Sequence, residues 1–266
     1  MRSIFLTISA AMAIWPAFCA TAKGHEVKVF ASNLHLPPGG GKTTIYLRYG
    51  HRMPIDDLLD AKSLEKYEVI SPDGTSRPIP AEGLGVHAAV MRLEAPGLHR
   101  VVAVRRRAVF TYVFDTDGNR ALKRGGKSEH AGAKVDNATR YQDCGVAMIA
   151  CGDASKAPLP MGLPAEIVPL APPAEWRSGR DIQFKLLLAG KPAELAHVVA
   201  KPMGHKPDEG WAFATETNRA GVARFRADRP ATWLIKATVK TPASVDDSKD
   251  FDWNSITTSL TLEIEP

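Results

Sequence analysis

Short strand-like runs separated by turn residues are the feature that most restricts how this chain of 266 residues can fold. In segments such as 26–30, 44–49 and 182–188, valine, isoleucine, threonine and aromatic residues alternate with polar ones or form short apolar runs, as in β-strands. Clusters of Gly, Pro and Asp bound these runs, and Ser71-Pro72-Asp73-Gly74 is a strong β-turn signal. Apolar residues almost nowhere recur with the period of a helix. The sequence therefore predicts an all-β protein.

Prolines divide the predicted strands into two groups. Six of them crowd residues 158–173, a density that a sheet ladder does not accommodate. We therefore expect a Pro-rich domain junction there. Residues 23–157 predict a first β-sandwich domain, and residues 174–266 predict a second one with six or seven strands and frequent turns.

Two local features of the first domain follow from the same signals. The runs 88–93 and 98–104 flank the turn Ala95-Pro96-Gly97 and predict a β-hairpin. Residues 123–137 are polar and glycine-bearing, which predicts a loop.

The first 22 residues predict a cleavable signal peptide. Arg2 gives a positive start, and the apolar run Ile4–Ile14 is too short to span a bilayer. Ala20-Thr21-Ala22 fits the small-x-small pattern of a signal-peptidase site. Since no second long apolar segment follows, we expect a periplasmic or secreted protein with no stable membrane insertion after cleavage.

Cleavage after Ala22 would create a metal-binding terminus. The free amine of Lys23, two backbone amides and the imidazole of His25 supply four nitrogens for a square-planar Cu(II) or Ni(II) ion. Cleavage two residues later would make His25 itself terminal, and its amine and imidazole would then chelate together. A polar residue in a flexible leader is the competing interpretation of His25. His51, after Gly50 at the end of a predicted strand, is a second candidate ligand, because strand-end loops carry function.

Two cysteines, Cys144 and Cys151, remain after signal cleavage. In an oxidising compartment such a pair commonly forms a disulfide. The residues between them resemble a buried strand, which would hold the two Cα atoms about 23 Å apart, whereas a bridge needs about 7 Å or less. Either the segment folds back, with Gly145 as the place to do so, or both cysteines are free.

No enzyme signature is present in the sequence. No serine stands in a Gly-x-Ser-x-Gly frame and no His-Glu-x-x-His pair occurs, so we expect a protein that is not an enzyme. The formal net charge of +5 is spread along the chain apart from Arg105-Arg106-Arg107. We interpret this basicity as solvated surface, and we expect no nucleic-acid partner.

The chain resembles a family of exported bacterial proteins that carries the label domain of unknown function 4198. The segments that carry the resemblance are His25-Glu26-Val27, Tyr49–Pro54, Ser71–Gly74, Ala95-Pro96-Gly97, Pro160–Pro169, Leu188–Pro192, Asn218–Phe225 and Thr232–Ile235. The resemblance implies two β-sandwich domains, the second similar to transthyretin-like, immunoglobulin-like or collagen-adhesin B-type modules. It also implies a metal role for His25 and His51, because some members are described as periplasmic components of nickel or cobalt uptake.

Two hypotheses from different classes follow. The first is a periplasmic accessory protein that presents Ni(II), or a related ion such as Co(II) or Cu(II), to a membrane transporter through His25, His51, Lys23 and Gly24. Affinity alone does not name the metal, because Cu(II) binds such nitrogen sites more tightly than Ni(II). The alternative is a β-sandwich module for adhesion or for binding carbohydrate or protein. A row of exposed aromatic residues, drawn from Trp211, Phe213, Trp233 and Trp253, would favour the alternative.

Overall fold

The computed structural model describes residues 25–51, 56–206 and 210–266, and within these ranges it contains strands and short 3₁₀ turns but no α-helix. The strands of the first half are β1 (Glu26–Ala31), β2 (His35–Leu36), β3 (Gly41–Gly50), β4 (Leu59–Asp60), β5 (Leu64–Ile70), β6 (Ser76–Pro78), β7 (Leu84–Gly85), β8 (His87–Leu93), β9 (Gly97–Arg105), β10 (Ala108–Phe114), β11 (Arg120–Arg124) and β12 (Lys134–Cys151). Those of the second half are β13 (Ala165–Pro169), β14 (Asp181–Leu188), β15 (Lys191–Pro192), β16 (His197–Pro202), β17 (Phe213–Glu216), β18 (Val222–Arg226), β19 (Ala231–Pro242) and β20 (Trp253–Ile264). The short turns are η1 (Ala61–Ser63), η2 (Lys127–His130), η3 (Pro173–Glu175) and η5 (Asp247–Lys249). The predicted all-β class is confirmed.

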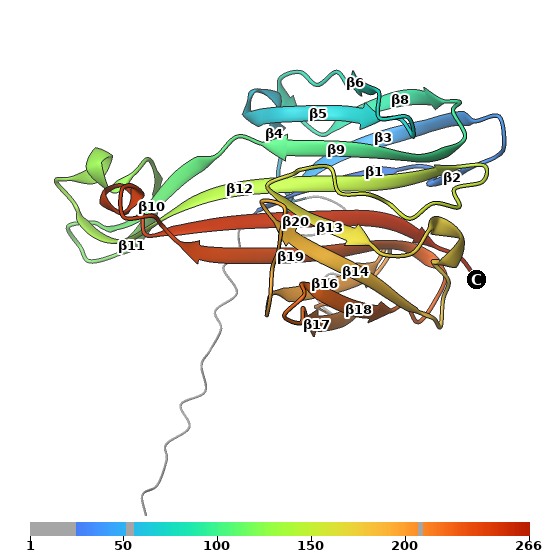
Figure 1. Ribbon diagram of the computed structural model, residues 1–266. Coiled ribbons are helices and arrows are strands. Elements are labelled where there is room, and N and C mark those ends of the chain that lie inside the picture. Colours follow the sequence, from blue (N-terminus) through green and yellow to red (C-terminus); the bar gives the residue numbers. More distant parts are fainter. Residues whose placement is uncertain (1–24, 52–55, 207–209) are drawn as a thin grey trace, which may run out of the picture.

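One large sheet runs through the middle of the molecule (Figure 1). Its strand order is β17-β16-β19-β20-β12-β9-β5-β6, with β10 and β11 extending it beside one end of β12. The link between the two halves of the sequence is the parallel pairing of β12 with β20, in register from Thr139 opposite Trp253 to Ala147 opposite Thr261. Both halves of the chain thus contribute strands to a single sheet.

Each face of this sheet is covered by a smaller sheet, so the molecule has two cores. Because side chains alternate along a strand, Ala147 and Ile149 of β12 face the core under β1, β3 and β8. Val146 and Met148 face the other core, together with β13, β14 and β18. The division into residues 23–157, 158–173 and 174–266 stays a prediction; the two cores lie back to back on a shared sheet.

The two cysteines are both buried and free. The strand between them is extended without interruption, so seven residues of alternation place Cys144 in one core and Cys151 in the other. The disulfide alternative, with its fold-back at Gly145, is therefore wrong. Gly145 serves a different purpose, because a Cβ there would lie 3.1 Å from Val27 Cγ1 and 3.2 Å from the Val27 carbonyl oxygen. Its missing side chain lets β1 cross closely over β12.

Two local predictions are wrong, and a third segment contains a strand that its proline content does not predict. β8 and β9 do not form a hairpin: β8 pairs with β3 while β9 pairs with β5 and β12, so the turn at Ala95-Pro96-Gly97 crosses between sheets. The predicted loop 123–137 contains the end of β11, turn η2 and the start of β12. The Pro-rich segment 158–173 holds strand β13, which pairs only with β14 and therefore lies at a sheet edge, where proline is tolerated. Alternation identifies a strand but does not select its partner.

Among the described residues, no helix has the length and apolarity needed to cross a membrane.

Candidate functional site

Antiparallel pairing brings the two predicted histidines together. β1 and β3 pair with Glu26 opposite Gly50, so the residue before β1 and the residue after β3 become neighbours. The ring centroids of His25 and His51 lie 4.2 Å apart at an interplanar angle of 37°. The other two predicted site residues, Lys23 and Gly24, lie outside the described residues.

Two further side chains hold His25 in this position. Its ring stacks on Tyr49 with centroids 5.1 Å apart, and its Nε2 lies 3.2 Å from Asp57 Oδ2. Asp57 reaches the site because its backbone forms an isolated bridge with Tyr49. Gly50, with φ of +120°, leaves room for the turn, since a Cβ there would lie 1.9 Å from Asp56 Oδ1. Sequence reasoning found both histidines but neither the aspartate nor the tyrosine.

The environment of His51 favours its neutral imidazole. Partial burial lowers its pKa first, and the neighbouring His25 lowers it further, while Asp56 and Glu26 oppose the shift. A neutral imidazole is the form that ligates metal ions. However, no group of three or more His, Cys, Asp or Glu side chains within the described ranges is arranged to hold a metal ion.

Directly behind the histidines lies a chain of buried charges. The side chains of Glu26 and Lys28 are each 1% exposed, and Lys28 Nζ lies 3.1 Å from Glu26 Oε1. Lys236 of β19 pairs with the other oxygen of Glu26. Lys28 also donates a hydrogen bond of 2.6 Å to the carbonyl oxygen of Gly50, next to His51. Burial lowers the pKa of Lys28, while Glu26 opposes the shift.

A second buried pair continues the same polar layer. Arg105 at the end of β9 donates to Asp143 of β12 at 2.8 Å and to the Tyr49 hydroxyl at 2.5 Å. Burial raises the pKa of Asp143 to about 6, although Arg105 acts in the opposite direction. We call the set that these contacts link the junction cluster: His25, Glu26, Lys28, Tyr49, His51, Asp57, Arg105, Asp143 and Lys236.

Lys201 of β16 borders the junction cluster. Its ammonium nitrogen lies 4.7 Å from the centroid of the Trp211 ring, and the Lys236 ammonium lies 5.5 Å from it. Burial lowers the pKa of Lys201, and Lys28 lowers it further. The sequence contained no signal for these contacts, because the residues come from strands whose pairing is set only in the folded chain.

Four other histidines have structural partners. His87 and His99 hydrogen-bond to the carbonyl oxygens of Leu59 and Ala95 at 3.0 and 2.8 Å. His35 Nδ1 lies 2.5 Å from Glu265 Oε1, and His130 bonds the Arg124 carbonyl.

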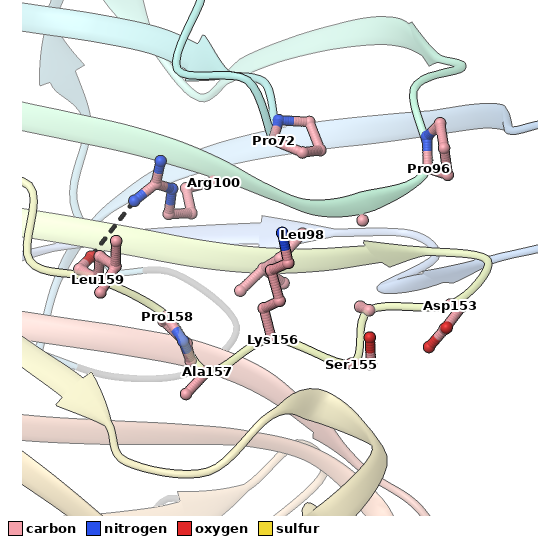
Figure 2. A pocket seen from close by; sticks show the side chains of 12 residues that line it. Pro72, Pro96, Leu98, Arg100, Asp153, Ser155, Lys156, Ala157, Pro158 and Leu159 are labelled. Atoms are coloured by element: carbon pink, nitrogen blue, oxygen red, sulfur yellow. Dashed lines mark hydrogen bonds between the residues drawn. The ribbon is translucent and has the colours of Figure 1, made fainter.

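A cavity lies elsewhere in the molecule. It has a volume of about 290 Å³ and lies between the β5–β6 turn, the start of β9 and the segment 153–159 (Figure 2). Figure 2 shows Pro72, Pro96 and Pro158 around it, and Arg100 donates to the Leu159 carbonyl at 3.3 Å. This guanidinium is thus engaged within the protein, and no histidine lines the cavity.

Fold and site together define an all-β protein of packed sheets, with a buried ionic layer beneath a pair of histidines. The model of the family called domain of unknown function DUF4198 matches residues 22–241, so the chain belongs to that family. No curated protein matches it.

Two solved structures show weak likeness to the chain. The D0-D1 domain of intimin has 12% identity and a TM-score of 0.23 over 91% of this chain and 100% of that one. The D00-D0 domain of intimin has 10% identity and a TM-score of 0.21 over 90% and 100%. Scores at this level carry no argument about function.

Proposed function

We propose that this protein is exported, loses residues 1–22, and binds a divalent metal ion that it presents to a membrane uptake system. Ni(II) is the proposed cargo, with Co(II) and Cu(II) as related ions. The observation that carries the proposal is the meeting of His25 and His51 at the start of β1 and the end of β3. The role is binding and delivery rather than catalysis, in the periplasm or outside the cell.

The chemistry of the site supports a nitrogen-rich complex. His25 is accessible, with 42% of its side chain exposed, and His51 favours a neutral imidazole. The two rings are tilted at 37° to each other with their centroids 4.2 Å apart, so both imidazoles lie within reach of the same small volume. A chain that begins at Lys23 adds a free amine and two amides to the imidazole of His25, which is the donor set for square-planar Ni(II) or Cu(II).

The test is calorimetry with Ni(II) and Cu(II) on protein whose N-terminus has been verified by mass spectrometry. We expect His25→Ala to weaken binding at least about tenfold, because it removes a ligand and not just a residue that supports one. His51→Ala should weaken it less if the terminal chelate dominates. His130→Ala, which removes a partly buried histidine bonded to a backbone carbonyl, serves as the matched control. Unchanged affinity in the His25 variant would overturn the site.

A second measurement separates the two ligand sets. Acetylation of the N-terminal amine removes the terminal chelate but leaves the histidine pair. Loss of binding after acetylation assigns the ion to residues 23–25, whereas retained binding that depends on both histidines assigns it to the imidazole pair.

The alternative of an adhesion module is not favoured by the aromatic residues. Trp233 is buried, whereas Trp253 is 37% exposed and carries Lys240 over its ring. The row of exposed aromatic side chains that would favour this alternative therefore lacks one of its members.

A further inference from the structure

The consecutive arginines Arg105, Arg106 and Arg107 form one wall of a cationic cavity. The cavity has a volume of about 180 Å³. Its charged lining consists of five cations and one carboxylate: Lys62, Arg105, Arg106, Arg107, Arg124 and Asp60. These basic residues, interpreted from the sequence as solvated surface, are brought together by the fold.

Three separate segments build the cavity. Arg106 and Arg107 connect β9 to β10, and the Arg106 amide donates to the Ser63 carbonyl at 2.8 Å, which ties this connection to η1 and Lys62. Arg124 arrives from the end of β11, where it is paired with Phe110 of β10. Backbone pairing thus places cations from distant parts of the sequence around one hollow.

Most of this positive charge has no counter-charge among the residues that the structure describes. Arg105 is paired with Asp143, and Arg107 donates to the neutral Gln142 at 3.1 Å. The side chains of Lys62, Arg106 and Arg124 make no hydrogen bond or ion pair with any described residue. Asp60 is the single carboxylate of the lining, and its Oδ1 accepts a hydrogen bond from the Lys62 backbone amide.

We infer that this cavity binds a small polyvalent oxyanion, one that carries several carboxylate or phosphate oxygens. Unpaired like charges gathered around a concavity repel one another and raise the local concentration of anions. Guanidinium groups match the geometry of carboxylate and phosphate oxygens, to which they donate in pairs. The volume is below the roughly 300–1,000 Å³ of pockets for drug-sized ligands, which suits a compact anion. This site is independent of the proposed metal site.

The experiment measures binding of two probes, citrate and pyrophosphate, by calorimetry on the metal-free mature chain. We expect at least one probe to bind with a dissociation constant below about 1 mM, and we expect that affinity to fall as salt is added. A preference for citrate assigns the site to carboxylates, and a preference for pyrophosphate assigns it to phosphates.

The double variant Arg106→Gln/Arg124→Gln removes two unpaired cations from the cavity. We expect it to weaken binding of the preferred probe at least about tenfold. The matched control Arg180→Gln/Arg219→Gln removes two exposed arginines outside the cavity and should change affinity by less than about twofold. Equal losses in both variants would mean that only the net charge matters, and absence of binding by the unaltered chain to both probes would also overturn the inference.

Discussion

The junction cluster and the cationic cavity are neighbouring groups of charges that share Arg105, yet they differ in how charge is compensated. In the junction cluster Glu26 contacts Lys28 and Lys236, and Arg105 contacts Asp143, all of them largely buried. In the cavity the side chains of Lys62, Arg106 and Arg124 have no partner among the described residues. Buried charges need internal partners because leaving one unpaired is costly, whereas exposed cations do not. The difference separates charge that holds the fold together from charge that is available to a ligand.

The largest expected effect comes from breaking the buried ion pairs of the junction cluster. Glu26→Gln keeps the shape of the side chain but leaves Lys28 and Lys236 without their carboxylate. We expect the free energy of unfolding to fall by about 3–5 kcal/mol, the usual cost of breaking a buried ion pair from one side. Urea denaturation measures it. The exposed Glu216→Gln on β17 is the control and should stay within about 0.5 kcal/mol. A similarly small effect at Glu26 would show that the buried charges are not coupled.

The next effect concerns Asp143 and pH. Its pKa is raised from an ordinary value near 3.8 to about 6, so the folded protein binds this proton more tightly than the unfolded chain does. The resulting stabilisation is complete below about pH 4 and is lost as the pH rises through 6, by up to about 3 kcal/mol. Asp143→Asn has no such proton to lose.

The measurement compares the unfolding free energies of the unaltered chain and Asp143→Asn at pH 4 and pH 7. We expect the difference between them to shift in favour of the variant as the pH rises. A shift in the opposite direction would mean that Arg105 outweighs burial and holds the carboxylate ionised at low pH.

The sequence predicts those features of the fold that depend on neighbouring residues, and it does not predict those that depend on contacts between distant segments. Period-two alternation and turn residues identify the strands, because each of these signals is contained in a stretch of a few consecutive residues. Strand partners are not local: β8 and β9 look like a hairpin but belong to different sheets, and β12 pairs with β20 more than a hundred residues later. Cys144 and Cys151 are assigned to opposite cores by the same pairing.

The candidate site follows the same rule. His25 stands out in the sequence because it follows the predicted cleavage site, and His51 because it comes at the end of a predicted strand. Antiparallel pairing then makes them neighbours. Asp143, Lys236 and Lys201 carry no such signal, since their positions within strands look like ordinary alternation. The Arg105-Arg106-Arg107 run is visible in the sequence, but its meaning depends on Lys62 and Arg124, which only the fold brings to it.

The smallest expected effect comes from removing the unpaired arginines of the cationic cavity. Without ligand, Arg106→Gln/Arg124→Gln should leave the free energy of unfolding within about 0.5 kcal/mol per substitution, or raise it slightly, because it relieves repulsion and breaks no ion pair. With the preferred probe at saturation, thermal unfolding of the unaltered chain should shift upward while that of the variant shifts less, since a ligand stabilises only the state that binds it. A large loss of stability in the ligand-free variant would place these arginines with the junction cluster, as charges that the fold itself requires.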